Sequence, residues 1–495
     1  MVRNQGVVNN LLQSIYSLNA KQVFAYAIGI ASIFFCAGIF FEQVLFFLIP
    51  FLCVGLGFII WDYRILYILF LITIPFSVEI YLPNGLGTDL PSEPIMLAIT
   101  GIGILLFITK IKEVDYSYLY NPITILLILH ICWIGVTSIG AQHPIVSFKY
   151  LLAKIWYVVP FFFMPFKLIQ SHLESKKAIY LLLIPLIAAV LWVLIRHAGY
   201  NFSFRTSNTV VYPIFRNHVS YAAILVMFLP FVYALRQLDI QNKTRKILLS
   251  LCILILVIGI YFSYTRAAQA SVIIAIAAYW MIKWKLTKPA VFAGVIGLFL
   301  GVGYLVNNKK YLDYAPNYQS TVSHFNYDNL LAATYKLEDI STMERVHRWV
   351  AGGRMLADKP LIGFGPANFY NTYQDYTLNE FQTYVSNNPE KSGIHNYYLM
   401  MAVEQGIFGL LIFLALLIAA LIRGEALYHR IKDEKSKIIV MAALICIVVS
   451  CSILLINDML EADKIGPIFF FSLSLLVVYD VIDQKTKVVL TDTNY

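Results

Sequence analysis

Uninterrupted apolar runs of about 17–20 residues recur along almost the whole chain, and a helix of that length spans the ~30 Å hydrocarbon core of a bilayer. Only 13% of the 495 residues are charged, whereas a soluble domain carries about 25%. Backbone polar groups in lipid must be satisfied within the protein, and the short alternating segments of a membrane barrel are absent from the sequence. The sequence therefore predicts an all-α integral membrane protein.

The apolar runs predict about fourteen membrane-spanning helices, and twelve also fit the pattern. We place them at 22–41, 44–60, 65–82, 94–111, 122–140, 149–168, 178–196, 218–235, 247–264, 267–283, 290–306, 396–422, 438–456 and 466–484. The expected organisation has an N-terminal interfacial segment (1–21), transmembrane helices 1–11 (22–306), a large partly helical loop (307–394), transmembrane helices 12–14 (395–484) and a tail (485–495).

The charges of the loops predict the orientation of the chain. Loops on one side of the expected membrane are rich in Lys and Arg, for example 236–246 and 423–437. Because cytoplasmic loops carry such an excess, we expect both termini in the cytoplasm and the loop 307–394 on the outer side. Basic residues that lie at the outer boundary against this bias indicate an anionic ligand there; they are Lys149, Lys154, Arg196, Arg205, Arg216, Arg266, Arg345, Arg348, Arg354 and His395.

Several function classes find no support in the sequence. The six cysteines all lie inside apolar runs, with no spacing that suits a disulfide framework or a zinc site. A phosphate-binding Walker loop and a dinucleotide fingerprint are both absent. The net charge of +9 fits basic cytoplasmic loops and does not imply nucleic acid. We therefore expect no cofactor, no metal and no nucleic-acid partner.

The loop 307–394 has about 88 residues, far more than a usual connection, so we expect it to be functional. Residues 345–357 have the spacing of an amphipathic helix that Pro360 ends. A glycine-rich turn follows at 363–366. The loop returns to the membrane at His395, directly before an apolar helix.

An ordered set of short motifs resembles the O-antigen ligase and O-antigen polymerase superfamily of bacterial membrane glycosyltransferases. The motifs fall between about residues 205 and 410, and the N-terminal half is similar only in hydropathy. They are Phe215-Arg216-Asn217-His218, Tyr264-Thr265-Arg266-Ala267, Arg345 with Trp349, Asp358-Lys359-Pro360-Leu361-Ile362-Gly363-Phe364-Gly365, His395-Asn396-Tyr397-Tyr398-Leu399 and Glu404-Gln405-Gly406.

The resemblance implies a GT-C-like membrane fold and a transfer reaction in the inner membrane. A glycan would pass from an undecaprenyl-pyrophosphate carrier to an acceptor hydroxyl on the periplasmic face, without a metal. Ligases of the superfamily use lipid A–core as acceptor, polymerases extend carrier-linked repeats, and a related branch glycosylates proteins as an O-oligosaccharyltransferase. A single displacement would invert the anomeric centre.

The resemblance and the residue types together give candidate site residues. Arginine stays charged and binds phosphate through two donors, so Arg216 and Arg266 are expected to hold the pyrophosphate, with interfacial snorkelling as the alternative. His395 is the candidate base because its free pKa is near 6.5. His218 and His347 are rival bases, and we expect His347 to face solvent.

Further residues are candidates for substrate binding: Lys154, Arg205, Arg345, Asn396 and Trp349. Arg345 could instead pair with Asp358 or Glu344, and Trp349 could serve only to pack its helix. The acidic turn with Asp458, Glu461 and Asp463 fits either a solvated loop or carboxylates that partner the arginines or activate the acceptor.

Two other function classes fit part of the sequence. A flippase of lipid-linked glycans has a similar number of spans, but it needs access from both faces and usually two repeat-related halves, which this sequence does not show. A channel or assembly scaffold explains the spans but neither His395 nor the outer arginines. Within the transferase class we favour a ligase, with a polymerase next, and the sugar and acceptor stay open.

Overall fold

The structure is a computed structural model that describes residues 29, 32–34, 62–81, 87–109, 112, 115–314, 339–383, 386–388 and 392–492. The predicted segments 1–21 and 44–60 lie outside the described residues, as does most of the predicted span 22–41. The chain divides into two compact units, Met1–Phe70 and Leu71–Tyr495. In the first unit the described residues are helical. Apart from the helix at residues 62–73, all features discussed below belong to the second.

Helices dominate the second unit. Its first half contains η1 (Ile74–Phe76), β1 (Val78–Tyr81), β2 (Gly87–Leu90), α4 (Ser92–Thr109), α5 (Tyr116–Leu119), α6 (Pro122–Ile139), α7 (Pro144–Val158), η3 (Val159–Phe163), α8 (Met164–Leu168), α9 (His172–Ala198), η4 (Phe204–Thr206) and α10 (Ser207–Val211). Its second half contains α11 (His218–Leu238), α12 (Lys243–Phe262), α13 (Arg266–Lys283), α14 (Thr287–Val306), η5 (Asn307–Tyr314), α16 (Ile340–Asp358), α17 (Phe369–Thr372), η6 (Tyr373–Tyr376), η7 (Asn379–Phe381), α18 (Tyr397–Arg430), α19 (Glu434–Leu454) and α20 (Gly466–Asp492).

The expected all-α integral membrane fold is confirmed. Among the described residues, ten helices are long and apolar enough to cross a membrane. Helices lie at each predicted span from 94–111 to 466–484. The protein is therefore a multi-pass membrane protein.

The helix at the predicted span 65–82 ends earlier than expected. Residues 62–73 are helical, and the helix gives way to η1, which contains Pro75. Proline has no backbone N–H to donate and cannot continue an α-helix without a kink. Residues Val78–Tyr81 then form β1, which pairs antiparallel with β2, Val78 opposite Leu90. The apolar run thus continues as a strand, which hydropathy alone does not distinguish from a helix end.

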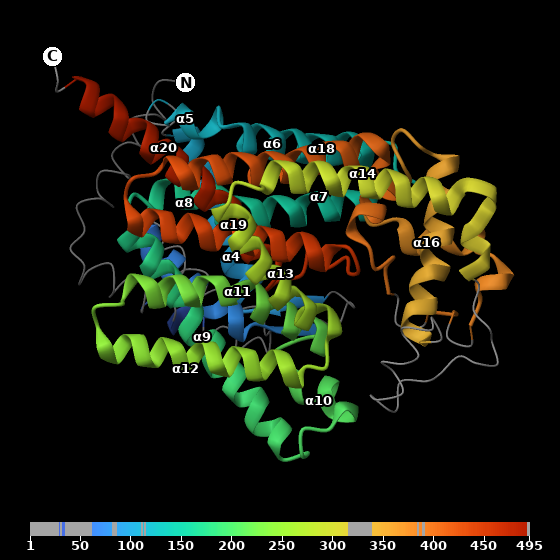
Figure 1. Ribbon diagram of the computed structural model, residues 1–495, viewed down its shortest axis with the longest axis horizontal. Coiled ribbons are helices and arrows are strands. Elements are labelled where there is room, and N and C mark those ends of the chain that lie inside the picture. Colours follow the sequence, from blue (N-terminus) through green and yellow to red (C-terminus); the bar gives the residue numbers. More distant parts are fainter. Residues whose placement is uncertain are drawn as a thin grey trace. The chain divides into compact units, whose positions relative to one another are not determined.

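Helix α19 lies at the centre of the second unit and packs against α11, α13, α18 and α20. These helices run side by side in Figure 1, with α16 beyond one end of them. Helix α14 lies at the periphery, with no residue of its apolar window buried. Helices α13 and α18 both begin at the end of the bundle that lies near α16.

Candidate active site

An ion pair joins the start of α13 to the start of α16. Arg266 is the first residue of α13, and its Nη2 lies 3.2 Å from Oδ2 of Asp339. Asp339 is fully buried and caps α16, since its side chain accepts a hydrogen bond from the backbone N–H of Thr342. The Asp339 carboxylate therefore holds both the N-terminus of α16 and the guanidinium of Arg266.

The sequence prediction missed Asp339, because it began the helix at residue 345. The structure begins α16 at Ile340. The signal was present in the sequence as an aspartate directly before the helical run, since aspartate is one of the residues preferred at a helix N-terminus. Its pairing with Arg266, 73 residues away in the chain, has no such local signal.

Three guanidinium groups gather at this end of the bundle, and we call Arg266, Arg345 and Arg348 the arginine cluster. Arg345 donates to the Oγ and carbonyl of Ser341, and Arg348 pairs with Glu344 at 3.4 Å. Each arginine also keeps one buried nitrogen with no hydrogen-bond partner among the described residues: Nη1 of Arg266, Nε of Arg345 and Nε of Arg348.

These unpartnered donors are unusual. A buried donor without an acceptor costs about 1–3 kcal/mol, and such groups in a folded protein call for an explanation such as an absent ion or ligand. The alternative pairing of Arg345 with Asp358 or Glu344 does not occur among the described residues: Asp358 accepts a hydrogen bond from Tyr376, and Glu344 pairs with Arg348. The arginine cluster thus keeps three unpartnered donor nitrogens, although Arg266 and Arg348 each pair with a carboxylate.

His395 lies beside the arginine cluster, in the loop that enters α18. Its Nδ1 is 3.8 Å from Oδ1 of Asp458, and its backbone N–H donates to Oδ2 of the same residue at 3.2 Å. Burial lowers the pKa of His395 to about 4; Asp458 acts against this shift, while Arg345 and Arg348 add to it. The imidazole is therefore neutral at pH 7 and able to accept a proton.

The backbone of His395 is held in an uncommon conformation. Its φ is +56°, in the left-handed region that side chains seldom adopt. The preceding carbonyls are fixed by α16, since Arg348 donates to Gly393 at 3.1 Å and the Trp349 indole donates to Ile394 at 3.0 Å. Strained residues of this kind concentrate at functional sites, where the surrounding structure imposes them.

Two predicted substrate-binding residues have structural contacts here. The indole N–H of Trp349 is occupied by the Ile394 carbonyl. The Asn396 side chain accepts from the backbone N–H of Leu399 at 2.9 Å and so caps α18. Their predicted contact with substrate stays a prediction, whereas their part in orienting His395 follows directly from these bonds.

The glycine-rich turn docks onto a break in α18. At Gly406 the helix has φ +70° and ψ −179°, so the carbonyls before it lose their helical partners. Val403 and Glu404 instead accept the N–H groups of Phe364 and Gly365, at 3.0 and 2.8 Å. A Cβ on Gly406 would lie 2.0 Å from the Leu361 carbonyl oxygen. Glycine at this position therefore determines how the glycine-rich turn packs against α18, the membrane helix that follows His395.

Replacing Gly406 with alanine is expected to destabilise the protein by at least ~2 kcal/mol, because a strained backbone and a steric clash coincide. Thermal unfolding in detergent measures this. Gly353→Ala is the matched control, since Gly353 lies inside α16 with nothing within 4 Å of its added Cβ. The control is expected to be neutral or to stabilise by up to ~1 kcal/mol. Equal unfolding temperatures for both variants would contradict the close contact between Gly406 and the Leu361 carbonyl.

Lys154 lies deep in the helical bundle and is only 1% exposed. Its Nζ is 2.6 Å from Oε1 of Glu461 and 3.1 Å from the Tyr397 hydroxyl. An intramembrane lysine needs such a partner. Glu461 follows Asp458 by three residues and Tyr397 follows His395 by two, so this ion pair adjoins the His395 site. Phosphate binding by Lys154 stays a prediction, and its charge is already offset by Glu461.

Arg216 and Arg205 belong to segments that contact the turn before Arg266. The Thr265 hydroxyl donates to the carbonyl of His218, two residues after Arg216. The Tyr264 ring meets the ring of Phe204, next to Arg205. Both arginines are exposed. The structure thus brings them to the same end of the bundle as Arg266, without a described contact between the three side chains.

The rival bases have other surroundings. We expected His347 to face solvent, which is wrong: it is 2% exposed, on the face of α16 that packs against its neighbours. His218 starts α11, and its Nδ1 lies 2.5 Å from Oδ1 of Asn208. His347 therefore lacks the access that a base needs to reach an acceptor hydroxyl, and one ring nitrogen of His218 is occupied by Asn208.

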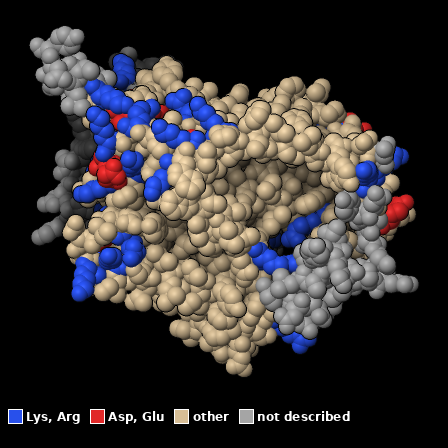
Figure 2. All heavy atoms as spheres, viewed as in Figure 1, with Lys and Arg blue, Asp and Glu red and all other residues tan. Residues whose placement is uncertain are grey.

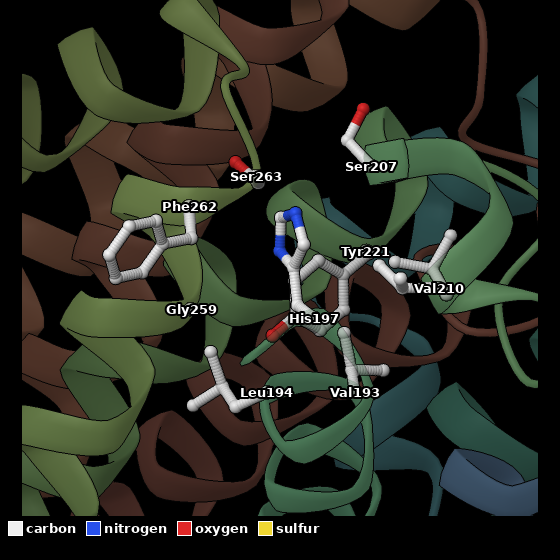
Figure 3. Close-up of a pocket in the computed structure, with 10 residues that line it drawn as sticks. Val193, Leu194, His197, Ser207, Val210, Tyr221, Gly259, Phe262 and Ser263 are labelled. Atoms are coloured by element: carbon white, nitrogen blue, oxygen red, sulfur yellow. The ribbon is translucent and has the colours of Figure 1, made fainter. Parts of the chain in front are cut away.

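A small cavity between α9, α10, α11 and α12 is not a substrate site. Figure 3 shows His197 pointing into it, toward the side where Ser207 and Ser263 lie. Its volume of about 10 Å³ has room for one water molecule at most. A wider hollow is visible in Figure 2 on the face toward α14, with Lys and Arg side chains at its edge.

Part of the chain is similar to a known protein family. Residues 251–414 match the model of a family described as O-Antigen ligase. The matched range contains Arg266, the helix α16 and His395, but not Lys154, Arg205 or Arg216. No curated protein matches the chain.

Proposed function

We propose that this membrane protein of the O-antigen ligase superfamily transfers a glycan from undecaprenyl pyrophosphate to an acceptor hydroxyl on lipid A–core. The observation that carries the proposal is the arginine cluster, whose unpartnered buried donors lie beside a neutral histidine. A diphosphate supplies the acceptors that these donors lack. The histidine supplies the base that an attacking hydroxyl needs.

The proposed reaction is a single displacement. The acceptor hydroxyl attacks the anomeric carbon and loses its proton to Nε2 of His395, since Nδ1 faces Asp458. The bond from the anomeric carbon to the phosphate oxygen breaks, and the lipid pyrophosphate leaves with the electron pair. Arg266 and Arg345 stabilise the charge that develops on the leaving group, with Arg216 as a further contact. The anomeric configuration inverts.

The proposed site faces the periplasm of the inner membrane. Lys and Arg side chains gather at the end of the bundle opposite α16 in Figure 2. Since basic residues concentrate on the cytoplasmic side, this distribution supports cytoplasmic termini and a periplasmic α16.

A transfer assay tests the proposed function. Purified protein is incubated with undecaprenyl-pyrophosphate glycan and lipid A–core, and the products are separated by gel electrophoresis. Glycan attached to lipid A–core is the expected product. Lengthened carrier-linked chains would instead identify a polymerase. Transfer only to a protein would identify an O-oligosaccharyltransferase, and transport of intact carrier without any transfer would identify a flippase.

The rate of transfer is expected to follow the protonation of His395. Burial lowers the pKa of His395, so the imidazole of the free enzyme stays neutral even at pH values where an ordinary histidine would be protonated. We therefore expect kcat/KM to fall only when the pH drops toward about 4. The bound pyrophosphate favours the protonated imidazole and raises this pKa. The acid limb of kcat is therefore expected at higher pH than that of kcat/KM. If kcat and kcat/KM fell at the same acidic pH, this would contradict the binding of a diphosphate beside His395.

Transfer is expected to survive an excess of chelator, because guanidinium groups supply the positive charge for the leaving group. The measurement is the rate of transfer with and without EDTA, on protein purified without added metal. Loss of activity that a single divalent metal restores would overturn this prediction.

A further inference from the structure

A groove of about 480 Å³ lies along α12 at the end of the bundle away from the arginine cluster. Three basic residues line one part of it: Arg236 of α11 and Lys243 and Lys246 of α12. Three apolar residues line the rest, Ile247, Leu251 and Leu254. These follow one face of α12 and are about half exposed, at 53%, 49% and 54%.

The basic part of the groove carries uncompensated charge. Nearby Lys176 and Arg245 both pair with Asp239, at 2.5 and 3.5 Å. Arg236, Lys243 and Lys246 have no ion pair among the described residues, although they lie in the same region. Arg236 is held in place, because its Nε donates to the Ser250 hydroxyl at 2.8 Å. The groove thus has one fixed cation, Arg236, with Lys243 and Lys246 beside it, and this charge favours an anion.

The apolar part determines what kind of anion fits. Lys243 and Leu254 are separated by about 16 Å along α12, at 1.5 Å per residue. A ligand that satisfies both parts has an anionic head at the start of α12 and a hydrocarbon chain along it toward Leu254. A free phosphate would use only the basic part.

We propose that this groove binds an anionic phospholipid of the surrounding leaflet. Basic pockets between membrane helices bind such headgroups, and the basic end lies where α11 ends and α12 begins. This end is one helix length, about 30 Å, from His218 and the start of α13. The lipid site is therefore separate from the proposed transfer site and belongs to the opposite leaflet.

Native mass spectrometry of the purified full-length protein in detergent tests the proposal. The protein is titrated with phosphatidylglycerol and with phosphatidylcholine of the same acyl chains. Preferential binding of phosphatidylglycerol is expected. The double variant Lys243→Ala/Lys246→Ala should bind it about 30-fold more weakly, because each basic residue near an anionic headgroup contributes about a factor of five.

The control variant Lys288→Ala/Lys432→Ala removes the same charge from exposed lysines at the same end of the bundle, outside the groove. It should bind phosphatidylglycerol like the unmodified protein. Equal loss in both double variants would mean diffuse attraction and would overturn the site. Full competition by glycerol phosphate would show a free-anion site and would overturn the lipid assignment. None of these readouts depends on glycan transfer.

Discussion

Replacing His395 with alanine is expected to lower glycan transfer by roughly 10²–10⁴-fold, the usual contribution of a general base. The imidazole is neutral, lies beside the arginine cluster and is oriented by Asp458 through its backbone and ring. The measurement is kcat for transfer to lipid A–core by purified protein. The loss should appear mainly in kcat, since the base acts in the transition state.

A second variant separates the loss of the base from the effect of the substitution on the strained backbone of residue 395. Alanine tolerates φ +56° poorly, whereas asparagine adopts left-handed conformations more readily and cannot accept the proton. His395→Asn should therefore fold like the unmodified protein and be as inactive as the alanine variant. His143→Ala is the control, because His143 is an exposed histidine that precedes α7. Activity of His395→Asn within a factor of a few of the unmodified protein would remove His395 from the mechanism.

Replacing Arg266 with lysine is expected to reduce transfer by about 10²–10³-fold, the effect of losing one donor to a developing negative charge. Lysine keeps the positive charge beside Asp339, but it cannot bind that carboxylate and a phosphate through separate nitrogens as a guanidinium does. Arg266→Ala should also abolish transfer. It leaves the buried Asp339 without its ion-pair partner, so part of its effect would be on folding.

The control for the lysine variant is Arg423→Lys. Arg423 also contacts one carboxylate, with its Nη2 3.5 Å from Oδ2 of Asp480, and it lies near the other end of α18. This control should transfer glycan at the normal rate and unfold at nearly the same temperature. Near-normal kcat for Arg266→Lys would show that Arg266 serves only to hold α16.

The positions of the candidate residues relative to the helices were predictable to a large extent. The apolar runs and the rule on loop charges placed Arg266 at the start of one helix and His395 before another, and the structure has α13 begin at Arg266 and α18 just after His395. The predicted turn at 363–366 also occurs, with φ +69° at Gly363 and +97° at Gly365. These are local features, because helix length, caps and turns depend on neighbouring residues.

The partners of the charged residues were not predictable. Lys154 was a candidate for phosphate binding, and the structure pairs it with Glu461, 307 residues away. His347 was expected to face solvent, and the packing of α16 buries it. The sequence left open whether the acidic turn is a solvated loop or supplies carboxylates to the site. In the structure, Asp458 of this turn contacts His395 and Glu461 contacts Lys154.

The sequence by itself determined the membrane fold, because a helix must satisfy its own backbone and cover it with apolar side chains for the whole width of a bilayer. It also pointed to the outer arginines and His395 as candidates for the chemistry, because basic residues at the outer boundary run against the usual charge bias. Only the tertiary structure decided which carboxylates offset these groups and which of their donor nitrogens stay unpartnered. That distinction depends on contacts between segments far apart in the chain, such as Asp339 with Arg266 and Asp458 with His395, which no local pattern encodes.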